Sequence, residues 1–221
     1  MSASDRGALA ARLHAALPQT QCTRCGYPDC EGYARAMADG EADINQCPPG
    51  GAEGVVRLSA LLARPPLPLN PDNGVEAPRG VAVIDEAWCI GCTLCIAACP
   101  TDALLGTNKR MHTIIEPYCT GCELCVPVCP VDCISMESVT GERTGWNAWS
   151  AEDASLALQR YEARKVRLAR EEIEHAERLE RKAREKLADL PNLVKGGDLE
   201  RKRAAIEAAL ARARARAPAK G

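Results

Sequence analysis

CIGCTLCIAACP (residues 89–100) and CTGCELCVPVCP (residues 119–130) are two copies of one cysteine motif and agree at seven of twelve positions. Each copy reads C-x2-C-x2-C-x3-C-P, and the two copies begin thirty residues apart, which indicates an internal duplication. This spacing is the one that wraps a 4Fe-4S cluster. We therefore expect two clusters in this part of the chain.

The order of cysteines in each run predicts how the clusters are held. Three thiolates at three-residue intervals can surround one cluster, while the fourth cysteine, ahead of the proline, is expected to start a helix and to ligate the partner cluster. Gly91 and Gly121 lie between the first two cysteines, where a positive φ lets backbone N–H groups face the sulfurs. Structural zinc is the alternative, but it usually takes four thiols in two C-x2-C knuckles. The expected sets are Cys89, Cys92, Cys95 with Cys129, and Cys119, Cys122, Cys125 with Cys99.

A third cysteine set lies upstream, with the spacing C-x2-C-x4-C-x16-C-P. Zinc is a serious alternative for this set taken alone, but the neighbouring motifs favour a third 4Fe-4S cluster. A helix is expected over residues 30–39, with Asp29 as its N-cap and Gly40 as its stop. Tyr33 and Met37 share one face of that helix and are expected to pack over the cluster. The expected ligands are Cys22, Cys25, Cys30 and Cys47.

The cysteine content indicates a reducing compartment. Of thirteen cysteines in 221 residues, twelve fall into the three metal-type sets, and no signal peptide precedes them. The thirteenth, Cys133, has no partner set and is expected to be a small buried hydrophobic residue. Phenylalanine is absent and aromatic residues make up 3% of the chain, so the clusters must supply much of the folding free energy. We expect the cluster-free protein to be poorly folded.

Four segments are expected along the chain. The N-terminal 4Fe-4S module covers residues 1–64, with flanking helices near 4–17 and 52–63, and a proline-rich linker covers 65–78. The double 4Fe-4S module covers residues 79–140, and a charged helical extension covers 150–221.

Short β-type runs flank the duplicated cysteine loops, at residues 81–85, 111–115 and 133–137. Such runs are typical of a two-fold β/α ferredoxin. The expected fold class is therefore α+β: a small N-terminal module, a bacterial-type double 4Fe-4S ferredoxin with two-fold βαβ repeats, and a helical C-terminal extension.

The extension differs from the rest of the chain in charge. One helix is expected near 150–189, ended by the LPN segment, and a second near 198–217. The two helices are expected to form a hairpin. Residues 151–221 hold eighteen Lys and Arg against thirteen Asp and Glu, whereas the remainder is acidic. A solvated extension or oligomerisation hairpin is the leading interpretation. Docking to anionic lipid or to an acidic partner is the alternative, and we expect no nucleic-acid binding.

No feature of the sequence predicts a substrate site. The three histidines, His14, His112 and His175, are scattered, and no nucleotide loop, nucleophile elbow or catalytic carboxylate pair appears. No apolar stretch reaches the eighteen or so residues of a membrane span. These observations favour a soluble protein that carries electrons rather than an enzyme with catalytic residues of its own.

Several motifs together resemble one family. PQTQCTRCGYPDC, GEADINQCPPGG, CIGCTLCIAACPTDALLG, MHTII and CTGCELCVPVCPVDCI are similar to the B subunits of the Rnf-type (Rsx-type) electron transport complex, over roughly residues 8–140. The resemblance implies three 4Fe-4S clusters, with all twelve ligand positions matched. It also implies electron transfer within a bacterial inner-membrane complex that couples NADH and ferredoxin redox chemistry to ion translocation, with the other subunits as partners.

Two departures from that family keep a second function open. Its members typically begin with a hydrophobic membrane helix, whereas this chain starts with MSASDRGALAARLH, and the charged extension lies outside the resemblance. The second hypothesis is a free-standing soluble polyferredoxin that serves other reductases or a redox sensor. The expected location is the cytoplasm, with peripheral contact at the inner membrane through the C-terminal helices.

Overall fold

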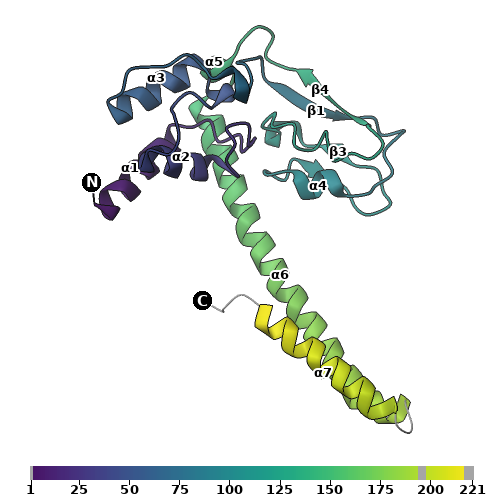
Figure 1. Ribbon diagram of the computed structural model, residues 1–221. Coiled ribbons are helices and arrows are strands. Elements are labelled where there is room, and N and C mark those ends of the chain that lie inside the picture. The colour runs from purple at the N-terminus through teal and green to yellow at the C-terminus, as the bar shows by residue number, and fades with distance from the viewer. Residues whose placement is uncertain (1, 194–197, 217–221) are drawn as a thin grey trace. The chain divides into compact units, whose positions relative to one another are not determined.

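The computed structural model describes residues 2–193 and 198–216. The chain divides into two compact units, the first ending at Glu162 and the second beginning at Ala163. The described elements confirm the α+β class, with helices in both units and short antiparallel strands in the first (Figure 1).

Three helices build the N-terminal module: α1 (Ala3–Ala15), α2 (Cys30–Asp39) and α3 (Gly51–Leu62). The expected helix over residues 30–39 is confirmed, because the Asp29 side chain accepts a hydrogen bond from the Gly32 N–H and Gly40 ends the helix with φ +79°. Helices α1 and α2 lie side by side (Figure 1). The module's core joins apolar residues of all three helices: Leu13, Leu17, Tyr33, Met37, Ile44, Val55 and Leu58.

Two small antiparallel ladders form the double cysteine module. Strand β1 (Gly80–Ile84) pairs with β4 (Ile134–Ser138), with Ala82 opposite Met136, and β2 (Leu104–Leu105) pairs with β3 (Thr113–Ile114). The sequence did not predict β2, whose two residues give no alternating pattern. One helical expectation was wrong: α4 (Leu94–Ala98) ends before Cys99 instead of starting there. The residues after Pro100 form a turn and lead into β2.

The segments around this module connect it to the N-terminal helices. In the proline-rich linker, Pro71–Asn73 form a 3-10 turn and Pro78 forms an isolated antiparallel bridge with Thr144. The short helix α5 (Gly145–Ala148) packs against α3. Glu76 in the linker accepts hydrogen bonds from the Ala52 N–H (2.8 Å) and from the Thr144 hydroxyl (2.7 Å). Glu76 therefore joins the linker to the first turn of α3 and to the residue just before α5.

Helix α6 (Ala151–Leu193) begins at the expected position and runs from the first unit into the second. Ser150 and Asp153 form a capping box at its start, where the Asp153 N–H donates to the Ser150 hydroxyl oxygen (3.1 Å). The expected break at residue 189 is wrong, because α6 continues through Pro191. Pro191 lies in the last turn of α6 and has no N–H to donate to the carbonyl of Leu187.

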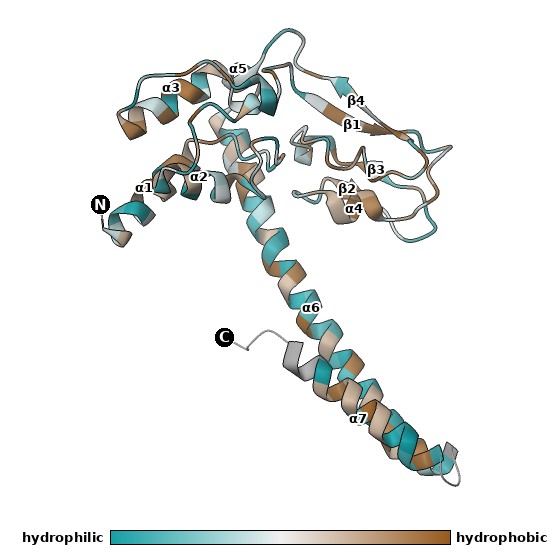
Figure 2. Ribbon diagram, viewed as in Figure 1, coloured by the Kyte–Doolittle hydropathy of each residue, from teal (hydrophilic) through white to brown (hydrophobic). Residues whose placement is uncertain are grey.

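Helix α7 (Asp198–Arg216) follows in the second unit, close to the expected range of 198–217. Residue 217 lies outside the described residues. Ion pairs within single helices are frequent here, including Arg184–Glu180 (2.7 Å) and Arg201–Asp198 (2.7 Å). Hydrophilic and hydrophobic residues are interspersed along α6 (Figure 2). None of the helices in the described ranges combines the length and apolar character needed to cross a membrane.

Candidate iron–sulfur sites

The thiols of the double cysteine module line two separate cavities in the first unit. We call the first cavity site 2; the predicted ligands that line it are Cys89, Cys92, Cys95 and Cys129. We call the second cavity site 3; the predicted ligands that line it are Cys99, Cys119, Cys122 and Cys125.

Each of these cavities combines three thiols of one run with the fourth thiol of the other. The chain achieves this through α4, which separates Cys95 at its start from Cys99 just beyond its end, so the two thiols line different cavities. None of the thirteen cysteines forms a disulfide. A cubane cluster binds each thiolate at its own iron, so a set of thiols around a cavity has the donor chemistry that the cluster requires.

Gly91 and Gly121 are needed at the positions where the sequence places them. Their φ angles are +67° and +70°, in the left-handed region that favours glycine. A Cβ on Gly91 would lie 2.4 Å from the carbonyl oxygen of Arg110, and one on Gly121 would lie 2.6 Å from that of Gly80. These close backbone contacts hold each ligand loop against the segment beside it.

Backbone N–H groups donate to two of the cysteine sulfurs in site 3. The Ala103 N–H donates to the Cys99 sulfur (3.2 Å) and the Ala82 N–H to the Cys119 sulfur (3.5 Å). Such donors stabilise negative charge on a bound cluster. The polarity of the site thus fits an anionic iron–sulfur group.

The N-terminal module gathers its own four thiols, Cys22, Cys25, Cys30 and Cys47, which we call site 1. Burial raises the pKa of Cys47 well above its usual value, and the neighbouring thiols of Cys30, Cys22 and Cys25 raise it further. Cys30 and Cys47 belong to the same core as Tyr33 and Met37. The Tyr33 hydroxyl donates to the carbonyl of Asp43 (2.6 Å), which holds the chain leading to Cys47.

Sites 1 and 3 are connected by direct contacts. The Thr120 hydroxyl, next to Cys119, donates to the carbonyl of Thr20 (3.0 Å), and Arg24 pairs with Glu123 (2.6 Å). Both contacts join a loop of site 1 to the second cysteine run. No pattern in the sequence indicated this pairing, because it depends on how the two modules pack.

Cys133 is buried, as expected from the sequence, but its surroundings were not foreseen. Its sulfur lies 3.5 Å from the Cys129 sulfur, and its side chain lines site 2 together with His112. His112 is also buried, with Nδ1 3.4 Å from the Cys95 sulfur. The thirty-residue repeat was the available signal, since it aligns Cys133 with Ala103 and His112 with Ala82.

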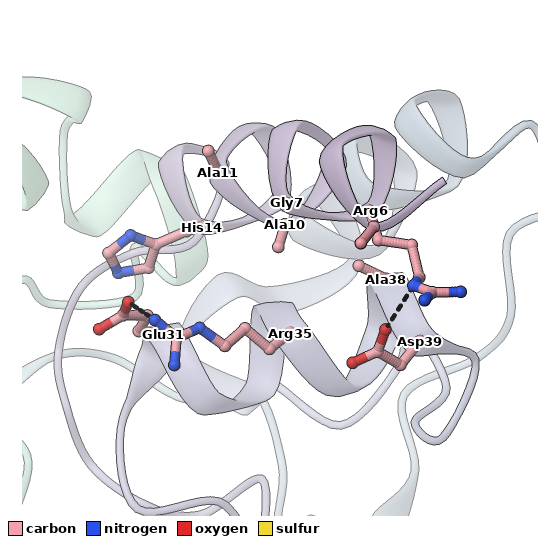
Figure 3. Close-up of a pocket in the computed structure, with 10 residues that line it drawn as sticks. Arg6, Gly7, Ala10, Ala11, His14, Glu31, Arg35, Ala38 and Asp39 are labelled. Carbon is pink, nitrogen blue, oxygen red and sulfur yellow. Dashed lines mark hydrogen bonds and ion pairs between the residues drawn. The ribbon is translucent and has the colours of Figure 1, made fainter. Parts of the chain in front are cut away.

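A separate surface hollow lies between α1 and α2 and contains none of the cysteines. Figure 3 shows Arg6 reaching Asp39 and Arg35 reaching Glu31 at its edge. The Arg6–Asp39 pair (3.5 Å) is half exposed, so it contributes little to stability. In the described part of the chain, no three His, Cys, Asp or Glu side chains converge closely enough to hold a single metal ion.

Comparison with protein families agrees with this geometry. Residues 82–136 match the family described as a 4Fe-4S dicluster domain, and residues 17–49 match the family described as a putative Fe-S cluster. The fold and these matches define the chain as a 4Fe-4S protein of the dicluster ferredoxin class.

Similar proteins narrow the class further. The chain is 61% identical over 135 residues to the B subunit of the ion-translocating oxidoreductase complex of Azoarcus sp. (strain BH72), covering 61% of this chain and 74% of the relative. It is 51% identical over 143 residues to the protein of the same name from Yersinia pestis, covering 64% of this chain and 76% of the relative. No solved structure matches. The chain belongs to the family formed by the B subunits of ion-translocating oxidoreductase complexes.

Proposed function

We propose that this chain transfers electrons through three 4Fe-4S clusters as the B subunit, or a close relative of it, in an Rnf/Rsx-like complex that couples NADH and ferredoxin redox chemistry to ion translocation. The clusters occupy sites 1, 2 and 3, and the twelve cysteines of those sites are their ligands. The chain has no substrate site of its own, and its partners are the other subunits of the complex.

One observation carries this proposal: each cavity of the double module mixes thiols from both runs. Cys129 lines site 2 and Cys99 lines site 3, which is the arrangement expected of cross-ligated cluster pairs. Four cysteines that bind one structural zinc ion form a self-contained set. Zinc binding would therefore not require each cavity to take one cysteine from the other run.

The contacts between modules support a relay with site 3 in its middle. Site 3 is joined to site 1 through Thr120 and Thr20, and to site 2 through the single helix α4. Electrons entering at either end of the first unit then pass through site 3.

Reduction of the clusters by the rest of the complex tests this function. The holoprotein is mixed with membranes that contain the other subunits of the complex but have lost this one, NADH is added, and bleaching of cluster absorption is followed. We expect bleaching that depends on the membranes. Clusters that dithionite reduces but that NADH and competent membranes leave oxidised would instead support a free-standing polyferredoxin.

A further inference from the structure

Sites 2 and 3 correspond to each other almost residue by residue under the thirty-residue repeat. Ile84 in site 2 corresponds to Ile114 in site 3, and Ile134 corresponds to Leu104. The two cavities are therefore two versions of one environment, and their differences are informative.

At two corresponding positions, site 3 has alanine and site 2 has a side chain that can donate a proton. His112 in site 2 corresponds to Ala82 in site 3, and Cys133 corresponds to Ala103. All four residues are buried. One backbone donor is shared, because the N–H of residue 133 bonds the Cys129 sulfur as that of Ala103 bonds Cys99. The second backbone donor of site 3, the Ala82 N–H, lies farther from its sulfur (3.5 Å).

Both polar side chains of site 2 contact ligand sulfurs. His112 Nδ1 lies 3.4 Å from the Cys95 sulfur, while the buried Nε2 has no hydrogen-bond partner among the described residues. The ring proton therefore belongs on Nδ1, where an acceptor is available. The Cys133 sulfur lies 3.5 Å from the Cys129 sulfur. A cysteine that binds iron does so as thiolate, so in that pair only Cys133 can donate.

Site 3 has two hydroxyl groups of its own, but their protons are used elsewhere. The Thr101 hydroxyl lies 3.9 Å from the Cys99 sulfur and donates to the carbonyl of Tyr118 (2.8 Å). The Thr120 hydroxyl, beside Cys122, donates to the carbonyl of Thr20 (3.0 Å). Each hydroxyl has one proton to give, so neither supplies the sulfurs of site 3 with a full donor.

We propose that His112 and Cys133 are positioning residues that hold the cluster of site 2 at a higher reduction potential than the cluster of site 3. Reduction adds negative charge to a cluster, and donors to its ligand sulfurs stabilise that charge. An electron that reaches the double module then rests on site 2, at the end of the relay. This inference rests on the proposed three-cluster function and adds a direction to it.

The test is an EPR-monitored redox titration of the full holoprotein at fixed pH. Cys133→Ala and His112→Ala remove one donor each and reproduce the residues of site 3. We expect one and the same midpoint to move to more negative potential in both variants, and to move further in the double variant. Cys133→Ser keeps a proton donor at this position, and its midpoint should stay closer to that of the parent protein.

Ala103→Cys supplies the matched control, because it places the missing donor in site 3. It should move a different midpoint to more positive potential, and this result does not depend on the variants of site 2 retaining their clusters. Iron and sulfide contents, measured on every sample, report on the proposed function separately. Unchanged midpoints in the double variant and in Ala103→Cys, with full cluster content, would overturn the inference, as would equal shifts in Cys133→Ala and Cys133→Ser.

Discussion

Cys99 shares a cavity with Cys122, twenty-three residues away, and not with Cys95, which is four residues away and in the same run. The helix α4 between Cys95 and Cys99 makes this possible, because its single turn carries the second thiol out of the first site. Each cavity is thus lined by both runs, and we expect neither cluster to form from one run alone.

Cys99→Ala is therefore expected to damage the cluster of site 3 more than the cluster of site 2. Removal of one of four thiolates leaves an iron without its protein ligand, whereas the other site keeps all four. EPR of the reduced variant, with signals assigned site by site, is the measurement. Cys129→Ala is the matched variant and should show the reverse pattern. Cross-ligation would be refuted if Cys99→Ala damaged only site 2 and Cys129→Ala damaged only site 3.

The sequence predicted the parts of this arrangement that depend on local chemistry. Asp29 and Gly40 fix the ends of α2 through a cap and a left-handed residue, both of which are local signals. The cysteine spacing predicted which thiols line each cavity of the double module, because it reflects the geometry of a cluster.

What the sequence did not predict depends on packing between distant segments. The contact of Thr120 with Thr20 spans one hundred residues and leaves no trace in either segment's pattern. Strand β2 has only two residues and exists through its pairing with β3. The LPN segment predicts a helix end, but α6 continues through Pro191, which lacks the N–H of one intrahelical hydrogen bond.

Cluster assembly should become more favourable as the pH rises from about 7 to about 8.5. Burial first, and neighbouring thiols in addition, raise the pKa of Cys122 and of Cys125 from 9.0 to about 12. These thiols are protonated in the cluster-free protein at neutral pH, so binding of the cluster releases their protons. Each proton released raises the equilibrium constant of assembly about tenfold per pH unit.

The same shifts predict the opposite trend for the cluster-free fold. A raised pKa stabilises that fold below pH 9.0 and the stabilisation is lost as the pH approaches about 12. Cluster occupancy in competition with an iron chelator, measured across the neutral to mildly alkaline range, tests the first trend. Occupancy that is independent of pH, or that falls as the pH rises, would contradict it.

The start of α6 is expected to stabilise the first unit. The Tyr161 hydroxyl donates to the Asp29 carboxylate (2.9 Å), and Arg160 lies over the ring of Tyr118 at 3.9 Å. Burial and the Asp29 charge raise the pKa of Tyr161, which keeps this donor protonated. Tyr161→Phe should lower the free energy of unfolding of the first unit by about 1–2 kcal/mol.

Two truncations extend this test. A chain cut after Glu162 keeps these contacts and should retain its clusters and its stability, whereas a chain cut after Ser150 loses them and should unfold at lower temperature. Thermal unfolding of the two holoproteins, followed by cluster absorption, compares them directly. Equal unfolding temperatures would show that the first turns of α6 are dispensable.

The second unit offers a separate prediction about membrane contact. Its sequence is basic overall, although intrahelical pairs such as Arg167–Glu171 (2.8 Å) use part of that charge. If this unit docks at anionic lipid, full-length protein should bind anionic vesicles and lose binding at high salt, because surface attraction is screened within about 10 Å at 0.1 M salt. The chain cut after Glu162 should not bind. Equal binding by both forms, or binding by neither, would leave α6 and α7 as a solvated extension.

The central claim is that the protein holds three clusters. The most direct measurement of this number is iron and acid-labile sulfide analysis of anaerobically prepared full-length protein. Three cubanes on twelve cysteines predict about twelve iron and about twelve sulfide per chain. A Cys22→Ser variant, which alters site 1 alone, should lower both values by up to about four. Stoichiometric zinc without sulfide, or about eight of each in the unaltered protein, would contradict the three-cluster assignment.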